Sequence, residues 1–208
     1  MLSNEQDTIR GEFVINPSMH IPPSMLPPLG EGETEDDRKN LSLQSRNGSV
    51  HADIWLLGSD SAKPRRTTVV LASSHGSIHT QLVRSPFTVP MHADTAQRTV
   101  GATPFALTAT APHGSVKLGI PRGFTGLLVL STRHGSVKLS EGLLEHATQL
   151  SQLGDTRRYF IGDFGLLGDQ WEGDQIDVEA VHGSIRLRYV DEGEEQGKKG
   201  LFSRLFGS

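Results

Sequence analysis

The sequence predicts an all-β protein in which repeated strand-turn-strand units stack as an irregular β-solenoid or a β-sandwich, with flexible tails at both ends. Three observations predict this class. A His/Asn-Gly-Ser tripeptide occurs five times. Apolar and polar residues alternate on both sides of each copy, which is the period of a half-buried strand. The 23 glycines and 11 prolines of the 208-residue chain indicate many turns.

Residues 1–37 are expected to form a disordered, proline-rich, acidic tail. The segment combines two Pro-Pro pairs with an acidic run from Glu31 to Asp37 and shows no apolar periodicity. Such a composition buries too little apolar surface to offset the entropy lost on ordering. The all-β repeat domain is therefore expected to span residues 38–192, followed by a flexible tail, 193–208.

The repeats align on their glycines, which are Gly48, Gly76, Gly114, Gly135 and Gly183. Apolar or small residues stand seven, five and three positions before each glycine and two and four positions after it. Around the third copy these are Leu107, Ala109, Ala111, Val116 and Leu118. Each unit thus reads as a strand, a tight turn and a second strand. Isolated units bury little surface, so neighbouring units are expected to stack.

The inward positions lie at odd offsets before each glycine and at even offsets after it. A corner in the backbone is therefore expected at the glycine, because a one-residue step otherwise turns every side chain to the other face. Glycine allows the positive φ that such a corner is expected to need. Asn47 and the histidines of the other copies tolerate the left-handed region better than most residues. The serine that follows each glycine is expected to bond neighbouring backbone.

The segments between the repeats are expected to be loops and one insertion. Residues 57–68 and 83–104 are predicted loops. Within 140–163, Ser140 is placed to cap a short helix, and a hairpin is expected around Gly154 and Asp155.

The histidines that precede the repeat glycines are the candidates for metal binding; they are His75, His113, His134 and His182. If the turns stack, their imidazoles form a ladder that suits zinc or a similar metal. No carboxylate recurs in the motif, however, and Asn47 replaces histidine in one copy. We interpret the four residues mainly as turn formers and keep the metal ladder as the alternative.

Catalysis by the His-Ser pairs is not expected, because no oriented third group and no nucleophile elbow accompany them. An acidic stretch offers a second candidate: Asp163, Asp169, Glu172, Asp174, Asp177 and Glu179. Its spacing fits neither an EF-hand loop nor a calcium-binding nonapeptide. A solvated face is the favoured interpretation, with calcium binding and a carboxylate pair as alternatives. No catalytic residue and no cofactor are therefore assigned.

Composition limits the partners and the compartment. A net charge of −4 and a pI near 6.1 argue against nucleic-acid binding. The chain lacks cysteine, a secretory signal pattern and any long apolar run, so a cytoplasmic location is expected. The C-terminal tail offers a possible membrane or partner contact through Leu201, Phe202, Leu205 and Phe206.

Several ordered segments resemble a fungal, basidiomycete domain-of-unknown-function family, number 7330. They are SRNGSVHADIWLLG, PRGFTGLLVLSTRHGSVKLS, RRYFIGD and WEGDQIDVEAVHGSIRLRYVDE. The Gly-Ser-Val strands are more distantly similar to adhesin-type β-solenoid repeats. The resemblance implies an all-β domain without an assigned activity. We expect a non-enzymatic binding or scaffolding module for a protein or glycan partner, with a polysaccharide-active hydrolase or a peripheral membrane protein as alternatives.

Overall fold

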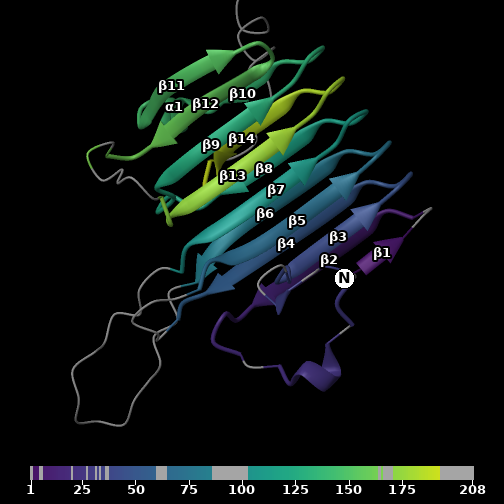
Figure 1. The fold of residues 1–208 in the computed structure, drawn as a ribbon. Helices are drawn as coiled ribbons and strands as arrows, with labels where there is room; N and C mark the ends of the chain where they lie inside the picture. Colours follow the sequence, from purple (N-terminus) through teal and green to yellow (C-terminus); the bar gives the residue numbers. More distant parts are fainter. Residues whose placement is uncertain are drawn as a thin grey trace, which may run out of the picture.

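The computed structural model describes residues 2–4, 7–19, 21–26, 28–30, 32, 34–35, 38–59, 65–85, 103–163, 165 and 171–192. These residues form a mostly β structure with one short α-helix and one 3-10 turn (Figure 1). The elements are β1 (Leu2–Asn4), β2 (Ile9–Ile15), η1 (Pro23–Met25), β3 (Leu41–Ser45), β4 (Val50–Leu57), β5 (Thr67–Ser73), β6 (Ile78–Ser85), β7 (Phe105–Thr110), β8 (Val116–Ile120), β9 (Gly126–Ser131), β10 (Val137–Leu139), α1 (Glu141–Leu144), β11 (Ala147–Leu153), β12 (Thr156–Ile161), β13 (Asp174–Glu179) and β14 (Ile185–Tyr189).

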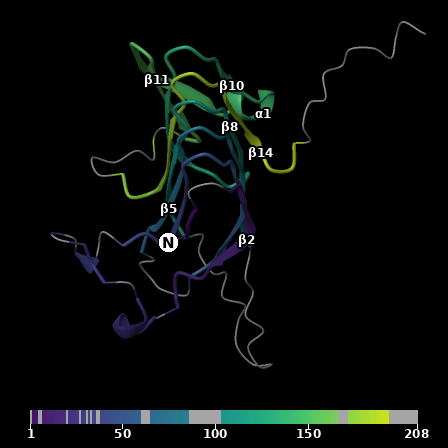
Figure 2. The ribbon, with the colours of Figure 1, turned by 90° about the vertical axis from the view of Figure 1, so that its right-hand side faces the viewer.

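The strands form two sheets that stand face to face (Figure 2). Sheet A has the order β1-β3-β5-β7-β13-β9-β12-β11, and sheet B has the order β10-β14-β8-β6-β4-β2. The two strands of each repeat belong to different sheets. The His/Asn-Gly-Ser turn is therefore the corner at which the chain passes from sheet A to sheet B.

Neighbouring units pair in parallel, with equivalent residues opposite one another. The second residue after each glycine makes this clear: Val50 pairs with Ile78, Ile78 with Val116, Val116 with Ile185, and Ile185 with Val137. The sequence alignment on the glycines is thus also the register of the sheets.

The units do not follow one another in space as they do in the chain. Strand β13 lies between β7 and β9, and β14 lies between β8 and β10. The last unit of the sequence is therefore an interior unit with a neighbour on each side. Beyond β9, the antiparallel strands β12 and β11 complete that edge of sheet A.

The core lies between the two sheets and includes most of the residues predicted to point inward. Leu71, Ile78, Leu128, Ile176 and Ile185 are all fully buried. Full burial of one such side chain contributes about 1.5–3 kcal/mol. Because each unit supplies only a few of these residues, the stacking of units creates the core.

The expectation of a disordered tail over residues 1–37 is wrong for its first part. Strand β2 pairs in parallel with β4, from Ile9 opposite Val50 to Ile15 opposite Leu56, and β1 pairs with β3. Ile9, Phe13 and Ile15 follow the two-residue period of a strand. This period was missed because the prolines further along the chain indicated disorder for the whole segment. These two strands form an additional unit that lacks the Gly-Ser signature.

The expected insertion between residues 140 and 163 is confirmed. The hydroxyl of Ser140 accepts a hydrogen bond from the Leu143 backbone at the start of α1. Strands β11 and β12 form the hairpin around Gly154, whose φ of 56° requires glycine. The predicted C-terminal tail, 193–208, lies outside the described residues.

Candidate functional site

The repeat glycines form a column at the corner, but the reason for glycine differs from the prediction. None of them has a positive φ, so the expected left-handed turn is wrong. A Cβ atom at Gly76 would lie 2.3 Å from the Gly48 carbonyl oxygen, and one at Gly114 would lie 2.0 Å from that of Gly76. At Gly183 and Gly135 the corresponding distance is 1.9 Å. Each glycine is required because the backbone of the next unit occupies the space of a side chain.

Hydroxyl groups hold the stacked corners together. The Ser77 amide donates to the Ser49 hydroxyl at 3.1 Å, and the Ser115 amide donates to the Ser77 hydroxyl at 3.2 Å. The Ser184 amide donates to the Ser115 hydroxyl at the same distance. These bonds confirm that the motif serine contacts neighbouring backbone, and they show that this backbone belongs to the next unit.

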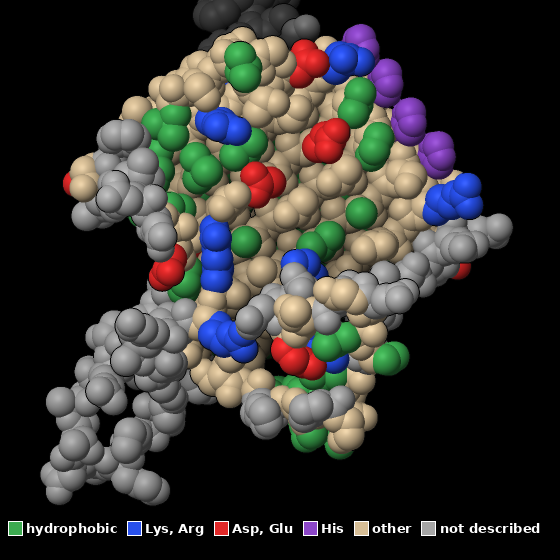
Figure 3. All heavy atoms as spheres, viewed as in Figure 1, with side chains coloured by type: hydrophobic (Ala, Val, Ile, Leu, Met, Phe, Trp, Pro, Cys, Tyr) green, Lys and Arg blue, Asp and Glu red, His purple; other side chains and the backbone are tan. Residues whose placement is uncertain are grey.

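The four corner histidines lie side by side as one column, which we call the histidine column. Ring centroids are 5.2 Å apart for His75 and His113, 5.3 Å for His113 and His182, and 5.1 Å for His182 and His134. The ring planes differ by only 5–13°, and the column follows one edge of the molecule (purple in Figure 3).

This arrangement is stacking rather than chelation. The lone pairs of an imidazole lie in its ring plane, so parallel rings direct them side by side and not toward one point. Among the described residues, no group of three or more His, Asp or Glu side chains is arranged to hold a metal ion. The imidazoles are therefore stacked as the ladder hypothesis predicts, but their lone pairs do not converge on a metal position.

Asp174 departs from the predicted solvated acidic face. Its side chain is 6% exposed and forms an ion pair with Arg84. Its carboxylate also accepts bonds from the Phe105 and Thr125 amides, at 3.2 and 3.3 Å. Burial raises the pKa of Asp174, and the Arg84 guanidinium opposes part of this increase. Asp174 thus fastens β13 to β6, β7 and the segment before β9.

The other acidic candidates do not converge on Asp174. Asp177 points outward from sheet A and accepts a bond from the Gln175 side chain at 2.8 Å, while Glu172 and Glu179 are exposed. The Asp163 carboxylate accepts a bond from the Gly165 amide. Asp169 lies outside the described residues. The predicted outward orientation thus holds for Asp177 and fails for Asp174.

A row of cationic and imidazole side chains crosses the outer face of sheet B. One residue comes from each strand, and each pairs in register with the next; in spatial order they are Arg10, His51, His79, Lys117, Arg186 and Lys138. We call this set the basic row. Five of its six members are the third residue after a repeat glycine. The repeat alignment places these five residues at one equivalent position. Only the register of sheet B shows that they form a continuous basic row and that Arg10 extends it.

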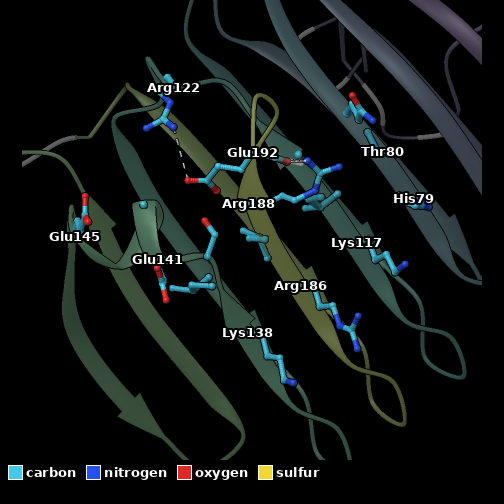
Figure 4. A pocket seen from close by; sticks show the side chains of 17 residues that line it. His79, Thr80, Lys117, Arg122, Lys138, Glu141, Glu145, Arg186, Arg188 and Glu192 are labelled. Atoms are coloured by element: carbon cyan, nitrogen blue, oxygen red, sulfur yellow. Dashed lines mark hydrogen bonds and ion pairs between the residues drawn. The ribbon is translucent and has the colours of Figure 1, made fainter. Parts of the chain in front are cut away.

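A groove of about 700 Å³ lies over one end of the basic row. Its floor includes Gly119, which stands between Gln81 and Arg188 in the register of sheet B. Because glycine has no side chain, the sheet surface is hollowed there. Figure 4 shows Lys117, Arg186 and Lys138 projecting from three adjacent strands, with Glu141 and Glu145 on the α1 side.

Two arginines of the groove are held by the segment that follows β14. The Arg122 side chain donates to the Asp191 carboxylate at 2.7 Å and lies 3.8 Å from that of Glu192. This hydrogen bond lowers the pKa of Asp191. The Arg188 side chain donates to the Glu192 carbonyl oxygen. Arg186 and Lys138, in contrast, form no ion pair within the described residues and face the groove.

The fold and the groove together define a class: a β-repeat domain of two largely parallel sheets with a basic groove on one outer face. The chain belongs to the family described as Domain of unknown function (DUF7330), whose model matches residues 1–192. No curated protein and no solved structure matches it. No helix of the described segments is both long and apolar enough to cross a bilayer.

Proposed function

We propose that this domain is an irregular two-sheet β-solenoid that serves as a non-enzymatic binding module, with its ligand site on the outer face of sheet B. The observation that carries the proposal is the groove of about 700 Å³ over the basic row. Its volume is within the range of ligand sites in proteins. Arg186 and Lys138 face this groove and form no ion pair with an acidic side chain of the described residues.

The distribution of carboxylates favours binding over hydrolysis. A glycosidase places two carboxyl groups on either side of the bond that it cleaves. Glu141 and Glu145 both belong to the α1 segment, and Glu192 lies beside Gly142 of the same helix. The opposite side of the groove is lined by Lys117, Arg186 and Lys138 (Figure 4). A substrate in the groove would therefore contact carboxyl groups on one side only.

A blocking variant tests the location of the site. Gln81→Trp places a large ring in the groove, and Thr108→Trp places the same ring on the outer face of sheet A, where Thr108 is exposed. Both are outward strand positions that accept an aromatic residue. On a glycan array we expect the wild-type signal to persist with Thr108→Trp and to disappear with Gln81→Trp. Equal signals from both variants, or shortening of a bound polysaccharide, would refute the proposal.

Peripheral membrane binding is the second candidate, and the position of the basic row on a single face favours it. Anionic lipid attracts clustered Lys and Arg side chains. The apolar tail residues proposed for membrane contact lie outside the described residues. Co-sedimentation with phosphatidylserine vesicles, with and without residues 197–208, tests this candidate; binding that depends on these residues supports it, and no binding excludes it.

A further inference from the structure

We propose that the ligand of the groove is a linear acidic polysaccharide that lies across the strands of sheet B, with its anionic groups on the basic row and its hydroxyl groups toward the carboxylates beside α1. This inference rests on the proposed binding function and adds the chemical class of the ligand, its direction and the residues that recognise it.

The spacing of the basic row is set by the sheet. Adjacent strands are about 4.8 Å apart, so six strands in register offer side chains at regular intervals over about 24 Å. A polysaccharide with one anionic group per sugar has a charge repeat about as long as a sugar ring, which is comparable to this interval. The row thus suits a polymer with repeated charge better than a single small anion.

The chemistry of the row suits carboxylate or sulfate groups. Arg10 and Arg186 can bind an oxyanion through two parallel hydrogen bonds, and Lys117 and Lys138 bind one as point charges. His51 and His79, whose ring centroids are 5.9 Å apart, lie between the cationic ends. An imidazole N–H donates to either an anion or a hydroxyl group. Each strand of sheet B can therefore contact the polymer.

The carboxylates distinguish an acidic sugar from other polyanions. Glu141 and Glu145 are exposed where they line the groove, and a carboxylate only accepts hydrogen bonds. Sugar rings supply hydroxyl donors for them, whereas the phosphodiester backbone of DNA supplies none. Proteins that bind single-stranded nucleic acid stack its bases on aromatic side chains. Among the described residues, no Phe, Tyr or Trp lines the groove; the exposed Trp55 of β4 lies outside it.

The basic row concentrates positive charge on a chain that is acidic as a whole. The whole chain has a net charge of −4, yet the basic row has four Lys or Arg residues and no acidic one. Outward carboxylates lie elsewhere: Glu12 and Asp53 lie two residues further along β2 and β4, and β13 of sheet A carries Asp177 and Glu179. An anionic polymer is therefore attracted to the basic row itself.

Affinity measurements on the full chain test this inference. The probes are polygalacturonate, which carries carboxylates, heparin, which carries sulfates, and fully methyl-esterified polygalacturonate, which is the neutral control. The variants are Arg186→Glu in the row and Arg158→Glu on β12 of sheet A; both residues are exposed on strands and both variants change the charge equally. Circular dichroism establishes that each variant folds.

We expect wild-type binding to at least one charged polymer, weakening as salt screens the charges. Arg186→Glu should weaken it by about tenfold or more, and Arg158→Glu by less than about twofold. Equal binding of the neutral polymer, or binding of neither charged polysaccharide, would overturn the ligand class and leave the proposed binding module to its own test. Loss of the array signal in Thr108→Trp as much as in Gln81→Trp would instead overturn the proposed site.

Discussion

Replacement of Gly114 by alanine tests why glycine stands at the corners. The new Cβ atom would lie 2.0 Å from the Gly76 carbonyl oxygen and 2.9 Å from the Ser77 Cα atom. Both neighbours are backbone atoms of the adjacent unit, so no side-chain rotation relieves the contact. The two units must separate by more than about 1 Å to restore an ordinary van der Waals distance.

Such a separation strains or breaks the bonds that join the two corners. The Ser115 amide donates to the Ser77 hydroxyl at 3.2 Å, and the Ile78 amide donates to the Ser115 carbonyl at 3.0 Å. Each such bond contributes about 0.5–1.5 kcal/mol, and overpacking itself costs about 1–3 kcal/mol. We therefore expect Gly114→Ala to lower the free energy of unfolding by about 3–5 kcal/mol.

Two other glycines provide matched controls. An added Cβ atom at Gly123 meets nothing within 4 Å, and its φ is not positive, whereas Gly154 has equally free space but a φ of 56°. In urea denaturation followed by circular dichroism, Gly123→Ala should have almost no effect. Gly154→Ala should cost about 1–2 kcal/mol for the left-handed backbone alone. A Gly114→Ala loss no larger than that of Gly154→Ala would refute the close-approach explanation.

The remaining predictions concern the histidine column, the buried ion pair and the last unit. His113→Asn should cost about 1 kcal/mol, because it removes ring stacking at an exposed corner where another unit already has Asn47; a loss above about 3 kcal/mol in urea denaturation would contradict the account. Asp174→Asn should cost about 3–5 kcal/mol in the same assay, because Arg84 remains buried without its counter-ion, and a loss below about 1 kcal/mol would show that Asp174 does not fasten the strands. A chain that ends at residue 170 should lose its cooperative unfolding transition, because β13 and β14 are interior strands; a transition with the wild-type midpoint would contradict the strand order.

The repeated unit and its inward face could be predicted because both depend on local sequence. The period of two around each glycine identified the core residues, and Ser140 and Gly154 identified the short helix and the hairpin. The spatial order of the units could not be predicted. All units carry similar inward residues. No local pattern therefore shows that the last unit lies between the units of Gly114 and Gly135 rather than at an edge.

The role of single residues was harder to predict where it depends on distant partners. Asp174 resembles a solvated strand residue until β6 brings Arg84 against it. The repeat glycines were predicted to form the corner through a left-handed backbone, whereas the structure shows a close approach of the adjacent backbone. The basic row also depends on distant partners, because each unit contributes only one of its residues. Lys117 and Arg186 read as ordinary outward residues in sequence, and parallel pairing makes them neighbours.

The most direct test of the ligand site is a nuclear magnetic resonance titration of the ¹⁵N-labelled full chain with oligogalacturonate. We predict that the largest amide shift changes occur on the strands of sheet B, centred on Lys117, Arg186 and Lys138, and that the outer face of sheet A is unaffected. Shift changes confined to sheet A, or absent from sheet B at saturating ligand, would contradict it.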